Sequence, residues 1–228
     1  MPPIVSIVGL SGVGKTTLLE RLIPEIRKRS YRVAIIKHDV HGFEIDKPGK
    51  DSWRFTQAGS DIMILSSPDK LAMIKKVDRD STLPELVRLV GDSADIILTE
   101  GFKQREAPKI EIHRKIVGKE LLCRPDELVA LVTDEPLDSP VWQCSPEEIS
   151  KLADLIERTF LTNQKDEASL FVNGAPIPMA PFLQDLVAKT MMGMVSALKG
   201  VDEVQSLELS LKQTLPRINH IKGDKDDK

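Results

Sequence analysis

The chain has 228 residues, of which 41% are apolar and 29% are charged, a composition typical of a globular protein with a buried core. A formal net charge of −3 and an aromatic content of 4% argue against a nucleic-acid-binding surface. No apolar run is long enough for a membrane span or a secretion signal, and we therefore expect a soluble protein of the cytoplasm.

The first part of the chain alternates predicted strands with predicted helices. A buried strand is predicted over residues 1–8 and an amphipathic helix over 16–29. The apolar stripe of that helix consists of Leu18, Leu19, Leu22, Ile23 and Ile26. Further strands are predicted over 32–37, 61–66, 71–75, 95–99, 109–113 and 127–133, and further helices over 52–58, 83–90 and 146–160.

Local patterns predict how some of these elements begin or pair. Strands 61–66 and 71–75 are expected to pair across the turn at 67–69. Residues 109–113 alternate apolar and polar side chains, which is typical of a half-buried or edge strand. Ser145 suits a helix N-cap, Pro146 the first helical position, and Glu148 completes a capping box. The alternation of strands and helices predicts an α/β fold, a mostly parallel sheet with helices on both faces.

The character of the sequence changes after residue 162, where we place the end of the main domain. Residues 161–169 are polar and predict a linker, and 170–212 predict a small α+β extension followed by a solvated tail over 213–228. In the extension, Asn173-Gly174 favours a hairpin, Pro181 opens a helix that ends at Gly200, and 207–211 alternate like a strand. So small a unit should dock on the main domain or pair with another copy.

Residues 9–16, Gly-Leu-Ser-Gly-Val-Gly-Lys-Thr, match the phosphate-binding pattern G-x-x-x-x-G-K-[ST] at every fixed position, between a predicted strand and a predicted helix. We therefore predict a P-loop NTPase domain. The predicted nucleotide-binding residues are Gly9, Leu10, Ser11, Gly12, Val13, Gly14, Lys15, Thr16 and Thr17. Backbone amides and the helix N-terminus would bind phosphate, Lys15 would reach the β- and γ-phosphates, and the Thr16 hydroxyl would ligate Mg²⁺.

An acidic residue at the end of a neighbouring buried strand completes the metal site in many P-loop proteins. Glu100 follows the apolar run 95–99 and precedes a glycine. We expect Glu100 to bind Mg²⁺, directly or through a water, or to position the attacking water, so that Lys15 and Glu100 are the candidate catalytic residues. A solvated glutamate at a strand end is the alternative.

The segment 38–54 is rich in ionisable side chains, among them His38, His41, Asp46 and Asp51. A zinc site from the two histidines is conceivable, although no cysteine lies nearby. A solvated loop and a switch-like or partner-binding loop beside the phosphates are the other interpretations. The cysteines, Cys123 and Cys144, match no metal or redox motif, and we interpret them as buried free thiols, with a metal or disulfide role as the alternative.

The sequence indicates the bound base less clearly than it indicates the phosphate-binding loop. The guanine-reading pattern Asn-Lys-x-Asp is absent. Thr133-Asp134 follows the last predicted strand of the main domain, where a base-binding residue would lie. The Asp134 carboxylate could accept hydrogen bonds from the two guanine N–H donors.

Four segments, residues 9–25, 35–61, 95–114 and 130–136, together resemble the molybdopterin-guanine dinucleotide biosynthesis adaptor family (MobB). The resemblance covers most of residues 1–160 and leaves 170–212 outside it. It implies a homodimer that binds GTP with Mg²⁺, hydrolyses it weakly, and assists the molybdenum cofactor guanylyltransferase, which joins GMP to molybdopterin. It also implies that Asp46 and Asp51 lie near the phosphates, and it strengthens Asp134 as the guanine contact.

Three other functions remain open at this point. A pure interaction protein with a vestigial P-loop is one of them, although the intact Lys15 and Thr16 argue against it. A P-loop small-molecule kinase would need a lid, and no arginine-rich lid segment is recognisable in the sequence. A metal-insertion GTPase for another metalloenzyme would find its support in His38 and His41 alone.

Overall fold

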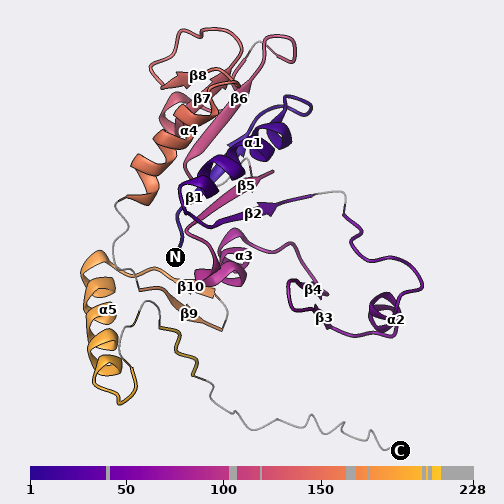
Figure 1. The fold of residues 1–228 in the computed structure, drawn as a ribbon, viewed down its shortest axis with the longest axis vertical. Coiled ribbons are helices and arrows are strands. Elements are labelled where there is room, and N and C mark those ends of the chain that lie inside the picture. The colour runs from indigo at the N-terminus through magenta and orange to yellow at the C-terminus, as the bar shows by residue number, and fades with distance from the viewer. Residues whose placement is uncertain are drawn as a thin grey trace, which may run out of the picture.

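The computed structural model describes residues 1–39, 42–102, 107–118, 120–162, 168–173, 175–201, 204 and 207–211. Its centre is a six-stranded sheet in the order β2-β5-β1-β6-β7-β8, in which every neighbouring pair is parallel (Figure 1). The strands are β1 (Ile4–Val8), β2 (Val33–Lys37), β5 (Ile96–Glu100), β6 (Lys109–His113), β7 (Leu128–Thr133) and β8 (Gln143–Cys144). The predicted parallel sheet is confirmed, and β8 is a short edge strand that the sequence did not reveal.

Helices cover both faces of this sheet, as predicted. On one face α1 (Lys15–Lys28) packs beside α4 (Ile149–Ile156), and the apolar residues of both helices share one core with Ile96 and Leu98 of β5. On the other face α3 (Leu83–Val90) buries Leu83 and Val87 against a second cluster that contains Ile97 of the same strand. Successive residues of β5 serve opposite faces because side chains alternate along a strand.

Strand β6 is not the half-buried or edge strand that the sequence pattern predicts. It lies between β1 and β7, and all five of its residues are buried. Two of its polar side chains have partners in the segment that follows: the Lys109 ammonium lies 2.6 Å from Glu127, and Glu111 accepts the backbone N–H groups of Leu122 and Cys123. The polar residues of this alternating pattern are therefore side chains with partners in the interior, and they do not face solvent.

The last helix of the main domain begins later than predicted. Helix α4 starts at Ile149, because residues 146–147 form a turn that precedes it. Half of the expected capping box is present, since the Ser145 N–H donates to the Glu148 carboxylate at 2.9 Å. The helix continues as a π-helical turn over Glu157–Leu161, and short 3₁₀ turns occupy Gly91–Ser93 and Pro125–Glu127.

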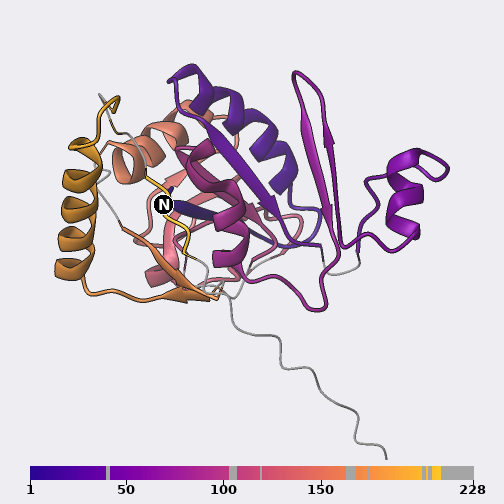
Figure 2. The same ribbon diagram turned by 90° about the horizontal axis from the view of Figure 1, so that it is seen from below.

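A hairpin stands apart from the central sheet. Strands β3 (Ile62–Ser66) and β4 (Leu71–Lys75) pair with each other in antiparallel fashion, as expected, and follow the short helix α2 (Asp51–Gln57). Figure 2 shows this hairpin and α2 on one side of the molecule. One face of the hairpin is apolar and exposed to solvent, and it carries Ile62, Ile64, Leu71 and Met73.

The C-terminal extension lies on the opposite side (Figure 2). It contains the predicted hairpin, formed by β9 (Leu170–Val172) and β10 (Ala175–Ile177), and the predicted helix, α5 (Pro181–Ser196). The expected strand over 207–211 is wrong, because these residues have no strand partner among those that the structure describes, and Leu211 is 87% exposed. Residues 163–167 of the expected linker and 212–228, which include the expected tail, lie outside the described residues.

Candidate functional site

The P-loop connects β1 to α1 at the carboxyl edge of the sheet. Gly9, Gly12 and Gly14 all have positive φ angles, of 152°, 75° and 103°. A Cβ atom at Gly9 would lie 2.7 Å from the Ile112 carbonyl oxygen and 2.8 Å from the Val13 side chain. The loop therefore runs so close to the end of β6 that no side chain fits at its first position.

The loop ends at the N-terminus of α1, where Gly14 is the N-cap and has no side chain with which to cap the helix. A helix start of this kind presents backbone N–H groups and the positive end of the helix dipole to an anion. The Lys15 ammonium donates to the Gly9 and Leu10 carbonyl oxygens, at 3.2 and 3.0 Å, and so lies over its own loop. Thr16 and Thr17 are exposed in the first turn of the helix.

Glu100 lies at the end of β5, on the strand between β1 and β2. It is in register with Ile7, two residues before the P-loop, and with Lys37 at the end of β2. Its side chain is 13% exposed, and the Lys37 ammonium lies 3.9 Å from its carboxylate. The fold thus brings the predicted acidic residue to the same sheet edge as the P-loop.

Residues that follow β2 contact both distant and neighbouring segments of the chain. The His38 ring lies 2.9 Å from the Asp80 carboxylate and 5.1 Å, between ring centroids, from Phe102. Asp46 accepts hydrogen bonds from the Lys47 N–H and the Ser52 hydroxyl with one oxygen. Its other oxygen is buried and has no hydrogen-bond partner within the described residues.

The conceivable zinc site is not supported. His41 lies outside the described residues. Within those that are described, no three histidine, cysteine or acidic side chains cluster as metal ligands would. Both cysteines are free thiols, and burial raises the pKa of Cys123 and of Cys144 to about 11, which disfavours the reactive thiolate form.

Asp134 follows β7 and faces the loop that follows β6. Its Oδ1 atom accepts the Lys115 N–H at 3.1 Å. The preceding Thr133 hydroxyl donates to the Glu135 carbonyl oxygen at 2.8 Å and fixes the turn. The predicted base-binding residue is therefore held at the same sheet edge as the P-loop, next to the end of β6.

Arg114 is a further residue of this region, one that no sequence motif predicts. It directly follows β6, and its guanidinium lies 3.5 Å from the point that a Cβ atom on Gly14 would occupy. The sequence offers only a basic side chain directly after a predicted strand, because the fold decides which strand lies beside the P-loop strand.

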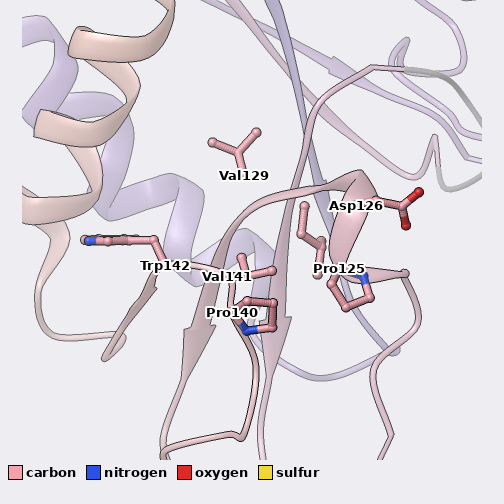
Figure 3. A pocket seen from close by; sticks show the side chains of 7 residues that line it. Pro125, Asp126, Val129, Pro140, Val141 and Trp142 are labelled. Carbon is pink, nitrogen blue, oxygen red and sulfur yellow. The ribbon is translucent and has the colours of Figure 1, made fainter.

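A separate hollow lies at the opposite end of the strands, where β7 and β8 begin (Figure 3). Its lining is mostly apolar and consists of Pro125, Asp126, Leu128, Val129, Pro140, Val141 and Trp142. None of the predicted site residues lines it. We therefore place the candidate functional site at the carboxyl edge of the sheet, where ligands of open parallel sheets bind.

The sequence also matches proteins of a known family. The family model described as molybdopterin guanine dinucleotide synthesis protein B (MobB) matches residues 4–134, more than half of the chain. The molybdopterin-guanine dinucleotide biosynthesis adapter protein of Haemophilus influenzae is 40% identical over 156 residues, which are 68% of this chain and 88% of that protein. The chain belongs to the MobB family.

Members of the MobB family differ in how much of the chain they match. A crystal structure of molybdopterin-guanine biosynthesis protein B has 29% sequence identity and a TM-score of 0.53, and the match covers 68% of this chain and 97% of that one. A relative from Methanocaldococcus jannaschii is 26% identical over 235 residues, which cover 91% of this chain and 97% of that protein. Because the second match covers 91% of this chain, it includes at least part of the C-terminal extension.

None of the helices in the part of the chain that the structure describes has the length and apolarity that a membrane crossing needs.

Proposed function

We propose that this protein is a GTP-binding adapter in the biosynthesis of molybdopterin-guanine dinucleotide, and that it acts in the cytoplasm. The observation that carries the proposal is an intact P-loop, from Gly9 to Thr16, in a chain of the MobB family. The relative from Haemophilus influenzae is named as an adapter protein of this biosynthesis. Its partner would be the guanylyltransferase that attaches GMP to molybdopterin.

The residues at the site suit a nucleotide with its metal ion. The uncapped start of α1 and the Lys15 ammonium would bind phosphates, and Asp134 would contact guanine. The Thr16 hydroxyl and the Glu100 carboxylate are oxygen donors of the kind that Mg²⁺ prefers. When bound, Mg²⁺ neutralises charge on the phosphates, and we propose that the intrinsic hydrolysis of GTP is slow.

A homodimer is part of the proposal. It is supported by the apolar face of the β3–β4 hairpin, where Ile64 is 57% and Leu71 67% exposed. Apolar side chains gathered on one exposed face are typical of a protein–protein contact.

The proposal is tested by titrating the protein with a fluorescent GTP analogue in Mg²⁺ and competing with unlabelled GTP or ATP. We expect GTP to compete better than ATP, and Lys15→Ala to weaken binding by tenfold or more, since it removes a charge-assisted contact with phosphate (about 1.5–3 kcal/mol). Lys28→Ala, on the exposed end of the same helix, is the matched control and should bind like the wild type. Stronger competition by ATP would instead favour the small-molecule kinase.

A further inference from the structure

The row of side chains that ends at Arg114 points toward the start of α1. Ile110 and Ile112 of β6 both belong to the core cluster that contains Leu18, Leu19 and Leu22 of α1. Because side chains alternate along a strand, Arg114 continues this row by one step beyond the end of β6. Its Nη2 and Nε atoms lie 3.5 and 3.8 Å from the point where a Cβ atom on Gly14 would be.

The guanidinium of Arg114 has no counter-charge in the described part of the chain. Its Nε atom is completely buried and has no hydrogen-bond partner among the described residues. Several other arginines of the protein lie against carboxylates, as Arg29 does with Glu157 and Arg79 with Glu85. A buried cationic donor without an acceptor is unfavourable, and an anion bound beside it would remove this penalty.

The segment that follows Arg114 links the two halves of the candidate site. A Cβ atom on Gly118 would lie 2.6 Å from the Leu10 side chain, so this segment lies against the P-loop. The Lys115 N–H donates to the Asp134 carboxylate on the other side. Arg114 therefore lies between the loop that would bind phosphates and the residue that would contact the base.

We propose that Arg114 binds the phosphate chain of the nucleotide, donating hydrogen bonds from its guanidinium to phosphate oxygens beside the P-loop. The proposal rests on the proposed function, because it requires the nucleotide to bind at residues 9–16. A planar guanidinium suits this contact, since it offers several donors to an oxyanion and keeps its charge at any physiological pH. Arg114 would thus add a second positive charge to that of Lys15.

The test compares Arg114→Met with the wild type in the full-length chain. Methionine keeps much of the apolar stem and removes the charge. We expect the affinity for GTP in Mg²⁺, and for inorganic tripolyphosphate, to fall about tenfold to a hundredfold. The salt dependence of tripolyphosphate binding should also become weaker, because one fewer cation contacts the anion.

Two further variants separate a phosphate contact from a structural role. Arg114→Lys keeps the positive charge and should recover part of the affinity for tripolyphosphate, which a loss of folding would not allow. Arg124→Met removes an exposed arginine that pairs with Asp126, away from the P-loop, and should bind like the wild type. The thermal stability of the ligand-free Arg114→Met protein should be unchanged or higher, because an unpaired buried donor has been removed.

The outcomes distinguish this proposal from the proposed function. If the wild type binds GTP, Lys15→Ala does not, and Arg114→Met binds tripolyphosphate like the wild type, then the role of Arg114 is refuted while the nucleotide site stands. If the wild type binds neither GTP nor tripolyphosphate, both proposals fail. A loss for Arg114→Met that Arg114→Lys does not relieve, together with a lower melting temperature, would assign Arg114 a structural role and overturn the phosphate contact.

Discussion

Single residues of the P-loop are constrained by the backbone around them rather than by the ligand alone. Gly9 has a φ of 152° and faces a backbone carbonyl oxygen, which cannot move aside as a flexible side chain would. Gly12 also has a positive φ, of 75°, but a Cβ atom there would meet nothing within 4 Å. The two glycines are therefore needed for different reasons: Gly9 for space and conformation, and Gly12 for conformation only.

This difference predicts the stability of two alanine variants. Gly9→Ala should lower the free energy of unfolding by roughly 3 kcal/mol, because it combines backbone strain with a clash against the Ile112 carbonyl. Gly12→Ala should cost about 1 kcal/mol, the strain of a positive φ alone. Urea unfolding followed by circular dichroism measures both values. Equal losses for the two variants would contradict the assigned cause.

At the scale of elements, helix α3 shows how a local motif fixes the start of a helix. The Glu85 carboxylate accepts the Thr82 N–H at 2.8 Å and the Thr82 hydroxyl at 2.9 Å, and it pairs with Arg79. Arg79, first, and then Thr82 lower the pKa of Glu85 from 4.5 to about 2. The folded state therefore binds the Glu85 proton less readily than the unfolded chain does.

The lowered pKa of Glu85 predicts a dependence of stability on pH. Wild type should be more stable than Glu85→Gln above pH 4.5, where the carboxylate is charged in both folded and unfolded states. The difference in unfolding free energy should shrink as pH falls from 4.5 toward 2, because the wild type then loses the ionised carboxylate. Thermal unfolding across this range measures it. Leu89→Ala, at an exposed uncharged position of the same helix, should differ from the wild type by an amount that does not change with pH.

At the scale of the whole molecule, the candidate site and the extension lie in different parts of the chain. Every predicted nucleotide contact falls before residue 162, within residues 4–134 that the MobB family model matches. The extension contacts the main domain where the Arg88 guanidinium lies over the Phe171 ring, 5.2 Å from its centroid. Its helix α5 leaves apolar side chains in solvent, with Phe182 78% and Met194 63% exposed.

We therefore propose a division into a nucleotide-binding domain, residues 1–162, and an extension, residues 170–212. A chain that ends at Thr162 should keep the GTP affinity of the full chain, because the P-loop and Asp134 are unaffected. It should also keep the dimer, because the β3–β4 hairpin remains. Fluorescence titration and light scattering after gel filtration measure these two properties. A monomeric short chain beside a dimeric full chain would assign the dimer contact to the extension.

The sequence by itself determined the position of the P-loop and nearly all of the helices and strands. Both depend on local physics: glycines at positive φ, a lysine and a threonine at a helix start, and apolar residues at strand or helix spacing. The same local signals located the β9–β10 hairpin and α5. Asp134 and Glu100 were predicted from their places after buried strands, and the fold brings both to the sheet edge of the P-loop.

The tertiary structure alone decided which surfaces are buried and which distant residues meet. Strand β6 is central because Lys109 and Glu111 find partners in residues 122–127, and periodicity carries no information about such partners. Residues 207–211 alternate like a strand, yet a strand forms only where a neighbour supplies hydrogen bonds. Arg114 reaches the P-loop because β6 lies beside β1, and that neighbour relation depends on strand order in the folded sheet.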